Sequence, residues 1–269
     1  MEYIILILLG IVAGTMGSLV GLGGGLVTVP VLLFFQQMGW LSQPLEHQNI
    51  VAISLMAIIF TAFASTITNY KHGRIDIKSG LIFFLGAGPA VAIGALVGMY
   101  VPEGIFYILF GILMLFTTYL LSVRDRIKPL DVKSDISRVF TCQGVTHRYS
   151  FNRYIAIGIS AIAGFIAGIF GVGGGSFYVP MMVILFKFPV HVATATSMFM
   201  ILLATVVGSI SHIMLGNVVL LYALFVGAGA YLGGVIGPTL ASKLSGRTIL
   251  VILRLIIVVV AIQMILKGI

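Results

Sequence analysis

The sequence predicts an all-α integral membrane protein with two inverted-topology repeats, each a glycine-rich helical hairpin, spanning or re-entrant, followed by three transmembrane helices. Three observations predict this fold class: the composition, a glycine motif that occurs twice, and the placement of the basic residues. Of the 269 residues, 60% are hydrophobic and 8% are charged, whereas a soluble domain carries about 25% charged residues. This composition excludes a soluble globular domain and a disordered chain.

Apolar runs alternate along the chain with proline, glycine and charged residues, and one polar stretch divides them into two sets. The runs cover about 3–20, 26–38, 49–70, 79–100 and 104–122, then 154–170, 176–188, 192–213, 218–240 and 248–266. We expect residues 1–122 to form the first repeat, 123–153 a cytoplasmic linker, and 154–269 the second repeat of one membrane domain. The run 26–38 is short for a membrane-spanning helix, which leaves open whether the hairpins cross fully or re-enter.

The two sets of runs are copies of each other. Gly14–Pro30 reads GTMGSLVGLGGGLVTVP and Gly164–Pro180 reads GFIAGIFGVGGGSFYVP, so seven positions are identical at a shift of 150 residues. Further along, a shift of 143 residues pairs Ser54 with Ser197. Internal duplication in a membrane protein is typical of secondary transporters.

The 15 Lys and Arg residues indicate the orientation, because basic loops stay on the cytoplasmic side of a membrane. Thirteen of them fall within four stretches: 71–78, 123–153, 187–191 and 241–247. With all four stretches inside, each hairpin enters and leaves on one side, and the two hairpins do so from opposite sides. We therefore expect both termini outside, and a net charge of +8 that orients the helices rather than binding nucleic acid.

We interpret Gly23–Gly25 and Gly173–Gly175 as the tips of the two hairpins, because successive glycines permit positive φ and close backbone approach. Pro30 and Pro180 follow, so the sequence predicts partly unwound backbone up to short helices that begin near the prolines. Unwound backbone at membrane depth lines a cavity or is buried in protein, and helix N-termini favour anions. Two converging tips predict a transporter for a small anion; helix packing alone is the alternative.

The paired G-x-G-G-G-x-x-x-V-P segments, each followed by a helix that carries Ser or Thr, resemble the TauE/SafE family of sulfite and organosulfonate exporters. Segment 189–197, PVHVATATS, is similar to the second signature of that family. The resemblance covers both halves and implies a multi-pass cell-membrane exporter of a small sulfur-containing anion such as sulfite, thiosulfate or an organosulfonate. The first half departs from the pattern, because QNIVAIS at 48–54 lacks the Thr-Ser pair of 196–197.

The tip glycines and nearby hydroxyls are the expected substrate-binding groups. These candidates are Gly23, Gly24, Gly25, Gly173, Gly174, Gly175, Ser54, Thr196 and Ser197. Gln48, Asn49 and His191 begin the polar helices, where we expect them to cap the helix starts or to gate the anion path. Arg254 lies within the last apolar run, where it either snorkels to the surface or serves the anion.

No acidic residue falls well inside an apolar run, and protease, hydrolase and nucleotide-binding motifs are missing. We therefore expect no enzymatic activity, no cofactor and no metal. The lone Cys142 excludes an internal disulfide. Two other functions stay open: an anion channel with a glycine-backbone filter, and a membrane subunit that binds a partner through the linker.

Overall fold

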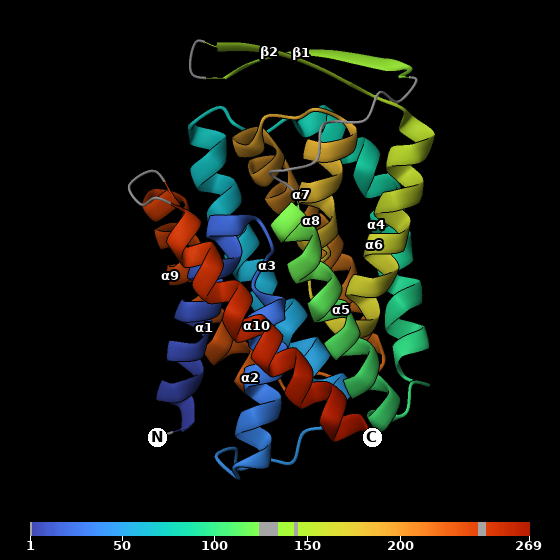
Figure 1. The fold of residues 1–269 in the computed structure, drawn as a ribbon. Coiled ribbons are helices and arrows are strands. Elements are labelled where there is room, and N and C mark those ends of the chain that lie inside the picture. The colour runs from blue at the N-terminus through green and yellow to red at the C-terminus, as the bar shows by residue number, and fades with distance from the viewer. Residues whose placement is uncertain (1, 124–133, 143–144, 242–245) are drawn as a thin grey trace.

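The computed structural model describes residues 2–123, 134–142, 145–241 and 246–269, and this part of the chain is almost entirely helical (Figure 1). Seven of the described helices are long and apolar enough to cross a membrane. The predicted class, a helical multi-pass membrane protein, is confirmed. Both ends of the chain lie at one end of the molecule, and a short β-hairpin covers the other (Figure 1).

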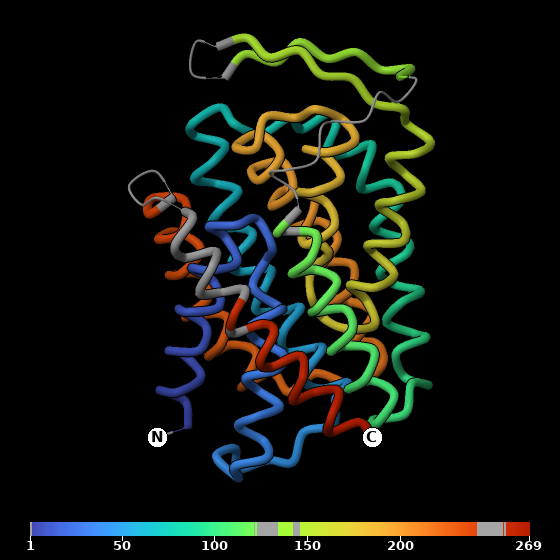
Figure 2. Tube along the Cα trace, in the orientation of Figure 1, coloured from blue at the N-terminus to red at the C-terminus, as the bar shows by residue number. Residues whose placement is uncertain are grey.

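The first half begins with a helical hairpin. Helix α1 (Glu2–Val20) runs into the interior, residues 21–24 reverse the chain, and α2 (Gly25–Gln37) returns toward the end where α1 began (Figure 2). Three long helices follow: α3 (His47–Lys71), α4 (Ile77–Gly98) and α5 (Glu103–Val123). The order agrees with the five apolar runs of the first predicted repeat.

The second half repeats this order. Helix α6 (Arg153–Phe170) is followed by a reversal at residues 171–174, then α7 (Gly175–Pro180), which continues as a π-helical turn, η1 (Met181–Leu185). Three long helices complete the chain: α8 (Val190–Met214), α9 (Leu220–Ala241) and α10 (Gly246–Gly268). The α6 hairpin starts beneath the β-hairpin, at the end opposite to the start of α1 (Figure 1).

Each helical hairpin packs against a helix from the other half: α1 lies along α9, and α6 lies along α4. The contact points occupy equivalent sequence positions. A Cβ on Gly14 would lie 2.5 Å from the carbonyl oxygen of Ala230, and a Cβ on Gly164 would lie 2.5 Å from that of Ala87. Glycine at these positions allows two membrane helices to approach closely, and it thereby interlocks the two halves.

The all-α prediction omitted a β-hairpin within the polar stretch. Strands β1 (Ile136–Cys142) and β2 (Val145–Phe151) pair antiparallel. Alternate residues of β2 face the helices, because Tyr149 and Phe151 are buried and the ring of Tyr149 lies 3.9 Å from that of Phe188. The last four residues of the second strand, RYSF, alternate polar and aromatic side chains, which is the pattern of a half-buried strand.

The predicted helix starts near Pro30 and Pro180 are wrong: α2 begins at Gly25 and α7 at Gly175, five residues earlier. The carbonyl oxygen of Gly24 accepts hydrogen bonds from the backbone N–H groups of residues 27 and 28, and Gly174 does the same for 177 and 178. These bonds start the helix before the proline. A proline one turn into a helix then removes one backbone hydrogen bond, and in the second half a π-helical turn follows it.

Candidate functional site

The two glycine tips have the same backbone conformation. Positive φ angles occur at equivalent positions: 82° at Gly21 and 69° at Gly171, then 87° at Gly23 and 75° at Gly173. The residues before the helix starts, Gly24 and Gly174, have φ of 102° and 73°. Only glycine adopts this left-handed region readily, so the duplicated glycines are explained by the reversal that each tip makes.

The tips touch each other through their backbones. A Cβ on Gly25 would overlap the carbonyl oxygen of Gly171, and a Cβ on Gly175 would overlap that of Gly21. Each helix start is therefore pressed against the reversal of the other half. The structure thus brings the six predicted tip glycines, Gly23 to Gly25 and Gly173 to Gly175, together in the interior.

Two isoleucines cover both tips. A Cβ on Gly23 would lie 3.1 Å from Ile58 and 3.4 Å from Ile201, and a Cβ on Gly173 would lie 3.2 Å and 3.5 Å from the same two side chains. Ile58 and Ile201 are 143 residues apart, the shift that relates α3 to α8. A cavity beside Gly24 measures only about 10 Å³, which is too small for a polyatomic anion. The tips are closed in this conformation.

One serine in each of the polar helices α3 and α8 forms a hydrogen bond with the glycine tip of the other half. The hydroxyl of Ser54 in α3 donates to the carbonyl oxygen of Gly171 at 2.7 Å. The hydroxyl of Ser197 in α8 donates to that of Gly21 at 3.2 Å and to that of Thr194 at 2.8 Å. Both serines are fully buried. In this conformation both hydroxyls donate hydrogen bonds to glycine carbonyls of the tips, so they are not free to donate to a ligand.

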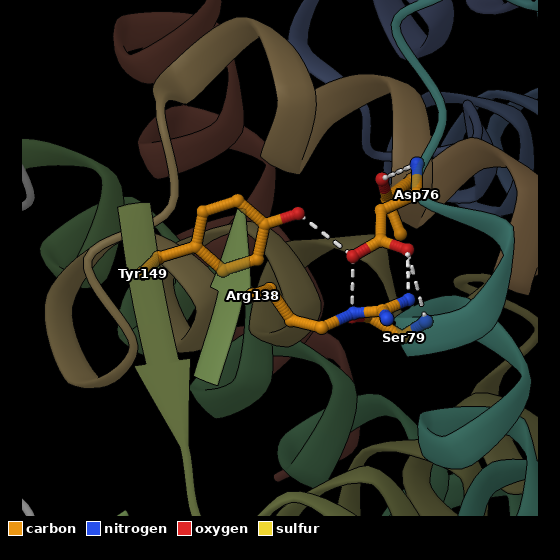
Figure 3. Close-up of polar contacts among 5 residues, drawn as sticks. Asp76, Ser79, Arg138 and Tyr149 are labelled. Atoms are coloured by element: carbon orange, nitrogen blue, oxygen red, sulfur yellow. Dashed lines mark hydrogen bonds and ion pairs between the residues drawn. The ribbon is translucent and has the colours of Figure 1, made fainter. Parts of the chain in front are cut away.

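Thr196, the third predicted hydroxyl, connects α8 to the start of α4. Its side-chain oxygen accepts a hydrogen bond of 3.0 Å from the backbone N–H of Asp76. Asp76 is buried and caps α4 by accepting from the backbone N–H of Ser79 at 3.2 Å. Its carboxylate also accepts from Arg138 at 3.0 Å and from Tyr149 at 2.7 Å, so one side chain fixes both strands of the β-hairpin (Figure 3).

The charge on Asp76 is stabilised by its partners. Burial by itself raises the pKa of this carboxyl, but the hydrogen bonds from Ser79, Tyr149 and Arg138 outweigh burial and hold its pKa below the ordinary value of 3.8. The pKa of Tyr149 is raised by burial and by its bond to the carboxylate. The sequence did not predict this cluster, because Arg138 is 62 residues away from Asp76 along the chain.

The predicted gating residues have different environments. Asn49 caps α3, since its side-chain oxygen accepts from the N–H of Glu46 at 2.9 Å, and its amide donates to the carbonyl oxygen of Asn217 at 2.9 Å. Gln48 donates a long bond of 3.5 Å to Met99. His191 begins α8, and its ring lies 5.5 Å from that of His147 in the β-hairpin. The side chain of Arg254 lies outside the described residues.

Two hydroxyls at the second tip were missed by sequence reasoning. Ser176 and Tyr178 are 1% and 0% exposed, and among the described residues neither hydroxyl has a hydrogen-bond partner. A Cβ on Gly174 would meet the Tyr178 hydroxyl at 2.8 Å, so this group lies against the tip. At the equivalent position of the first half, the Thr28 hydroxyl donates to Gly24 at 3.2 Å. The sequence signal was the replacement of Leu26 and Thr28 by these two residues.

The chemistry that this arrangement offers is hydrogen-bond donation. The two helix starts lie against each other's reversals in the interior, and the start of α7 carries the unpartnered hydroxyls of Ser176 and Tyr178. A helix start carries a partial positive charge. Among the described residues, no group of three or more His, Cys, Asp or Glu side chains is placed to hold a metal ion. A buried hydroxyl without a partner costs about 1–3 kcal/mol, which calls for an explanation such as a ligand.

Comparisons with known proteins match this chain to a family of membrane transporters. A family model described as sulfite exporter TauE/SafE matches residues 6–264. The chain is 41% identical to the probable membrane transporter protein YunE of Bacillus subtilis (strain 168), covering 100% of this chain and 99% of YunE. It is 27% identical to the probable membrane transporter protein MJ0441 of Methanocaldococcus jannaschii, covering 78% and 72%. No solved structure matches the chain significantly. The chain belongs to the TauE/SafE sulfite exporter family of membrane transporters.

Proposed function

We propose that this protein is a secondary transporter that moves a small sulfur-containing anion, such as sulfite, thiosulfate or an organosulfonate, out across the cytoplasmic membrane by alternating access. The family supplies the substrate class. The observation that carries the site is the pair of unpartnered, fully buried hydroxyls of Ser176 and Tyr178 beside the second glycine tip. Both can donate to an oxyanion.

Several donors must act together on the anion. One helix start contributes about 0.3–2 kcal/mol to a nearby negative charge, whereas burying an unpaired charge costs far more. Backbone N–H groups at the starts of α2 and α7, with the hydroxyls of Ser176 and Tyr178, provide donors from both halves around one point. The tips touch in the present conformation, so the anion binds when they separate.

The two halves supply the moving parts. Equivalent contacts recur in both halves, from the serine bonds at the tips to the glycine contacts of α1 with α9 and α6 with α4. Such pairing supports inverted repeats, in which one repeat rocks against the other around a central site. The excess of Lys and Arg near the β-hairpin end supports a cytoplasmic position for that end and an outer position for the termini.

Ligand binding to the purified protein tests the proposal directly, because a ligand that binds the native state raises the apparent Tm. The panel contains sulfite, thiosulfate, taurine as an organosulfonate, sulfate and acetate at matched ionic strength and pH. We expect a concentration-dependent rise in Tm with at least one of the first three anions, and a weaker rise with Tyr178→Phe. A Tm that no anion of the panel raises above the chloride control would contradict the proposed site.

A further inference from the structure

A second cavity lies beside the first tip, at the end of the molecule that carries the β-hairpin. It measures about 300 Å³ and is lined by polar side chains from three helices and a loop, among them Ser18, Asn69, Arg74, His191 and Thr194. A volume of that order accommodates a small ligand. The tip cavity beside Gly24 is far smaller, about 10 Å³.

The inner wall of this cavity is part of the tip assembly. The carbonyl oxygen of Thr194 accepts the hydrogen bond from Ser197, whose hydroxyl also reaches Gly21. A Cβ on Gly21 would lie 2.9 Å from the methyl group of Thr194. A ligand in the cavity therefore lies one residue layer away from the first tip, on the path between it and the β-hairpin end.

The charge of the cavity is positive. Arg74 has its Nε buried without a hydrogen-bond partner among the described residues. The nearby carboxylate of Asp76 is paired with Arg138. His191 faces the ring of His147 and lines the cavity together with Arg74, so its described ionisable neighbours there are basic. Poorly neutralised basic groups in a hollow concentrate anions there.

The equivalent positions of the second half carry different side chains. A shift of 143 residues relates Asn69 to His212 and Arg74 to Asn217. There the two side chains contact each other, since Asn217 Nδ2 lies 3.3 Å from His212 Nδ1, and Asn49 donates to the Asn217 carbonyl oxygen. A pair of side chains that contact each other thus takes the place of Asn69 and Arg74. The two ends of the molecule therefore differ at these positions, with an arginine at one end and an asparagine at the other.

We propose that the cavity lined by Ser18, Asn69, Arg74, His191 and Thr194 is the vestibule that collects the oxyanion on the β-hairpin side and delivers it to the glycine tips. This assignment rests on the proposed function, and it deepens that function by naming the loading side. The positive charge of Arg74 attracts the oxyanion, and the Thr194–Ser197 segment separates the vestibule from the glycine tips. Loading from the basic end matches an exporter whose β-hairpin side is cytoplasmic.

Reaction with charged thiol reagents tests the vestibule without requiring transport. Cys142 is the single native cysteine, so a Cys142→Ser background carrying Thr194→Cys is labelled in nanodiscs with an anionic and a cationic methanethiosulfonate. The ratio of the two rates is divided by the same ratio for Ser134→Cys, an exposed position. We expect about a tenfold preference for the anionic reagent, and loss of most of the preference with Arg74→Gln.

Lys78→Gln removes an exposed charge that does not line the cavity and is the matched control, so it should leave the preference unchanged. If Thr194→Cys does not fold, Val190→Cys, at a 44% exposed position on the cavity wall, takes its place. Equal rates with both reagents, a preference that survives Arg74→Gln, or an unreactive thiol in folded protein would overturn the vestibule. Lack of transport of sulfite, thiosulfate and taurine alike by the wild type would instead overturn the proposed function, so the two failures are distinguishable.

Discussion

The hydroxyl of Ser54 in α3 donates a 2.7 Å hydrogen bond to the carbonyl oxygen of Gly171, which belongs to the tip of the other half. The equivalent bond from Ser197 to Gly21 completes a reciprocal pair. Each polar helix therefore holds the tip that its own half does not contain. A movement of one half as a rigid body against the other must stretch or exchange these two bonds.

Ser54→Ala and Ser197→Ala should each lower the stability of the protein. Each change leaves a buried glycine carbonyl without this donor, and such a loss costs about 1–3 kcal/mol. The measurement is the Tm of the purified variants in one detergent. Ser211→Ala is the control, because that hydroxyl donates to the carbonyl oxygen of Val207 within its own helix. Equal Tm values for Ser54→Ala and Ser211→Ala would show that the bond between the halves adds nothing to stability.

Gly25→Ala and Gly175→Ala should abolish anion transport. The added methyl groups would overlap the carbonyl oxygens of Gly171 and Gly21, and backbone cannot yield as a flexible side chain does. Sulfite flux into proteoliposomes, normalised to folded protein, measures the effect. Gly158→Ala is the control, because its added methyl group would have no atom within 4 Å outside its own helix. This variant should transport sulfite at the wild-type rate. Wild-type flux in folded Gly175→Ala would show that the tips need not meet.

The Tyr178→Phe variant tests whether the Tyr178 hydroxyl binds the anion or only stabilises the fold. The hydroxyl has no partner in the closed conformation, so its removal should leave the Tm unchanged or raise it. Sulfite affinity should fall by about tenfold, equivalent to 1.4 kcal/mol, because the anion loses a donor. Titration by isothermal calorimetry gives the Kd. A lower Tm together with unchanged affinity is the result that would assign the hydroxyl a purely structural role. Ser176→Ala should behave in the same way.

Asp76→Asn should weaken the attachment of the β-hairpin by about 2 kcal/mol, since hydrogen bonds to charged groups are worth about 1.5–3 kcal/mol. The folded-state pKa of Asp76 is lowered, so its contribution is complete above the unfolded value of 3.8 and is lost as the pH falls through the folded value. The Tm of the wild type should therefore fall more steeply than that of Asp76→Asn as the pH drops below about 4. Thermal unfolding across a pH series measures this difference.

Asp135→Asn is the comparison for Asp76→Asn. Asp135 also pairs with an arginine, Arg153, but both side chains are partly exposed, and exposed pairs contribute about 0–1 kcal/mol. The Asp135→Asn change should therefore lower the Tm only slightly at any pH above about 4. If Asp135→Asn matches the loss in Asp76→Asn, the buried cluster in Figure 3 is not what fixes the β-hairpin.

Periodic apolar runs and the duplicated glycines were sufficient to predict the helices and the two reversals. Positive φ at Gly23 and Gly173 follows from glycine's lack of a side chain, which is a local property. The early helix starts were not predicted, because Gly24 and Gly174 begin the helix through bonds to residues that precede the proline. The preference of proline for a first turn was outweighed by these bonds.

Long-range contacts could not be read from the sequence in the same way. The pairing of Asp76 with Arg138, and the position of Arg74 in the same cavity as His191, depend on how separate helices pack. Ser54 and Ser197 were singled out as candidate ligands for their place near the tips. The structure engages both with glycine carbonyls, and whether they also contact the anion stays a prediction.

Counterflow in proteoliposomes tests the central claim, carriage of a sulfur oxyanion by alternating access, most directly. Vesicles are preloaded with unlabelled sulfite and diluted into a trace of labelled sulfite, with Gly158→Ala as the positive control and Gly175→Ala as the negative control. A carrier should accumulate label transiently above equilibrium, with a rate that saturates as sulfite rises. A monotonic approach to equilibrium without saturation would identify a channel, and equal flux in empty liposomes would contradict transport of this anion altogether.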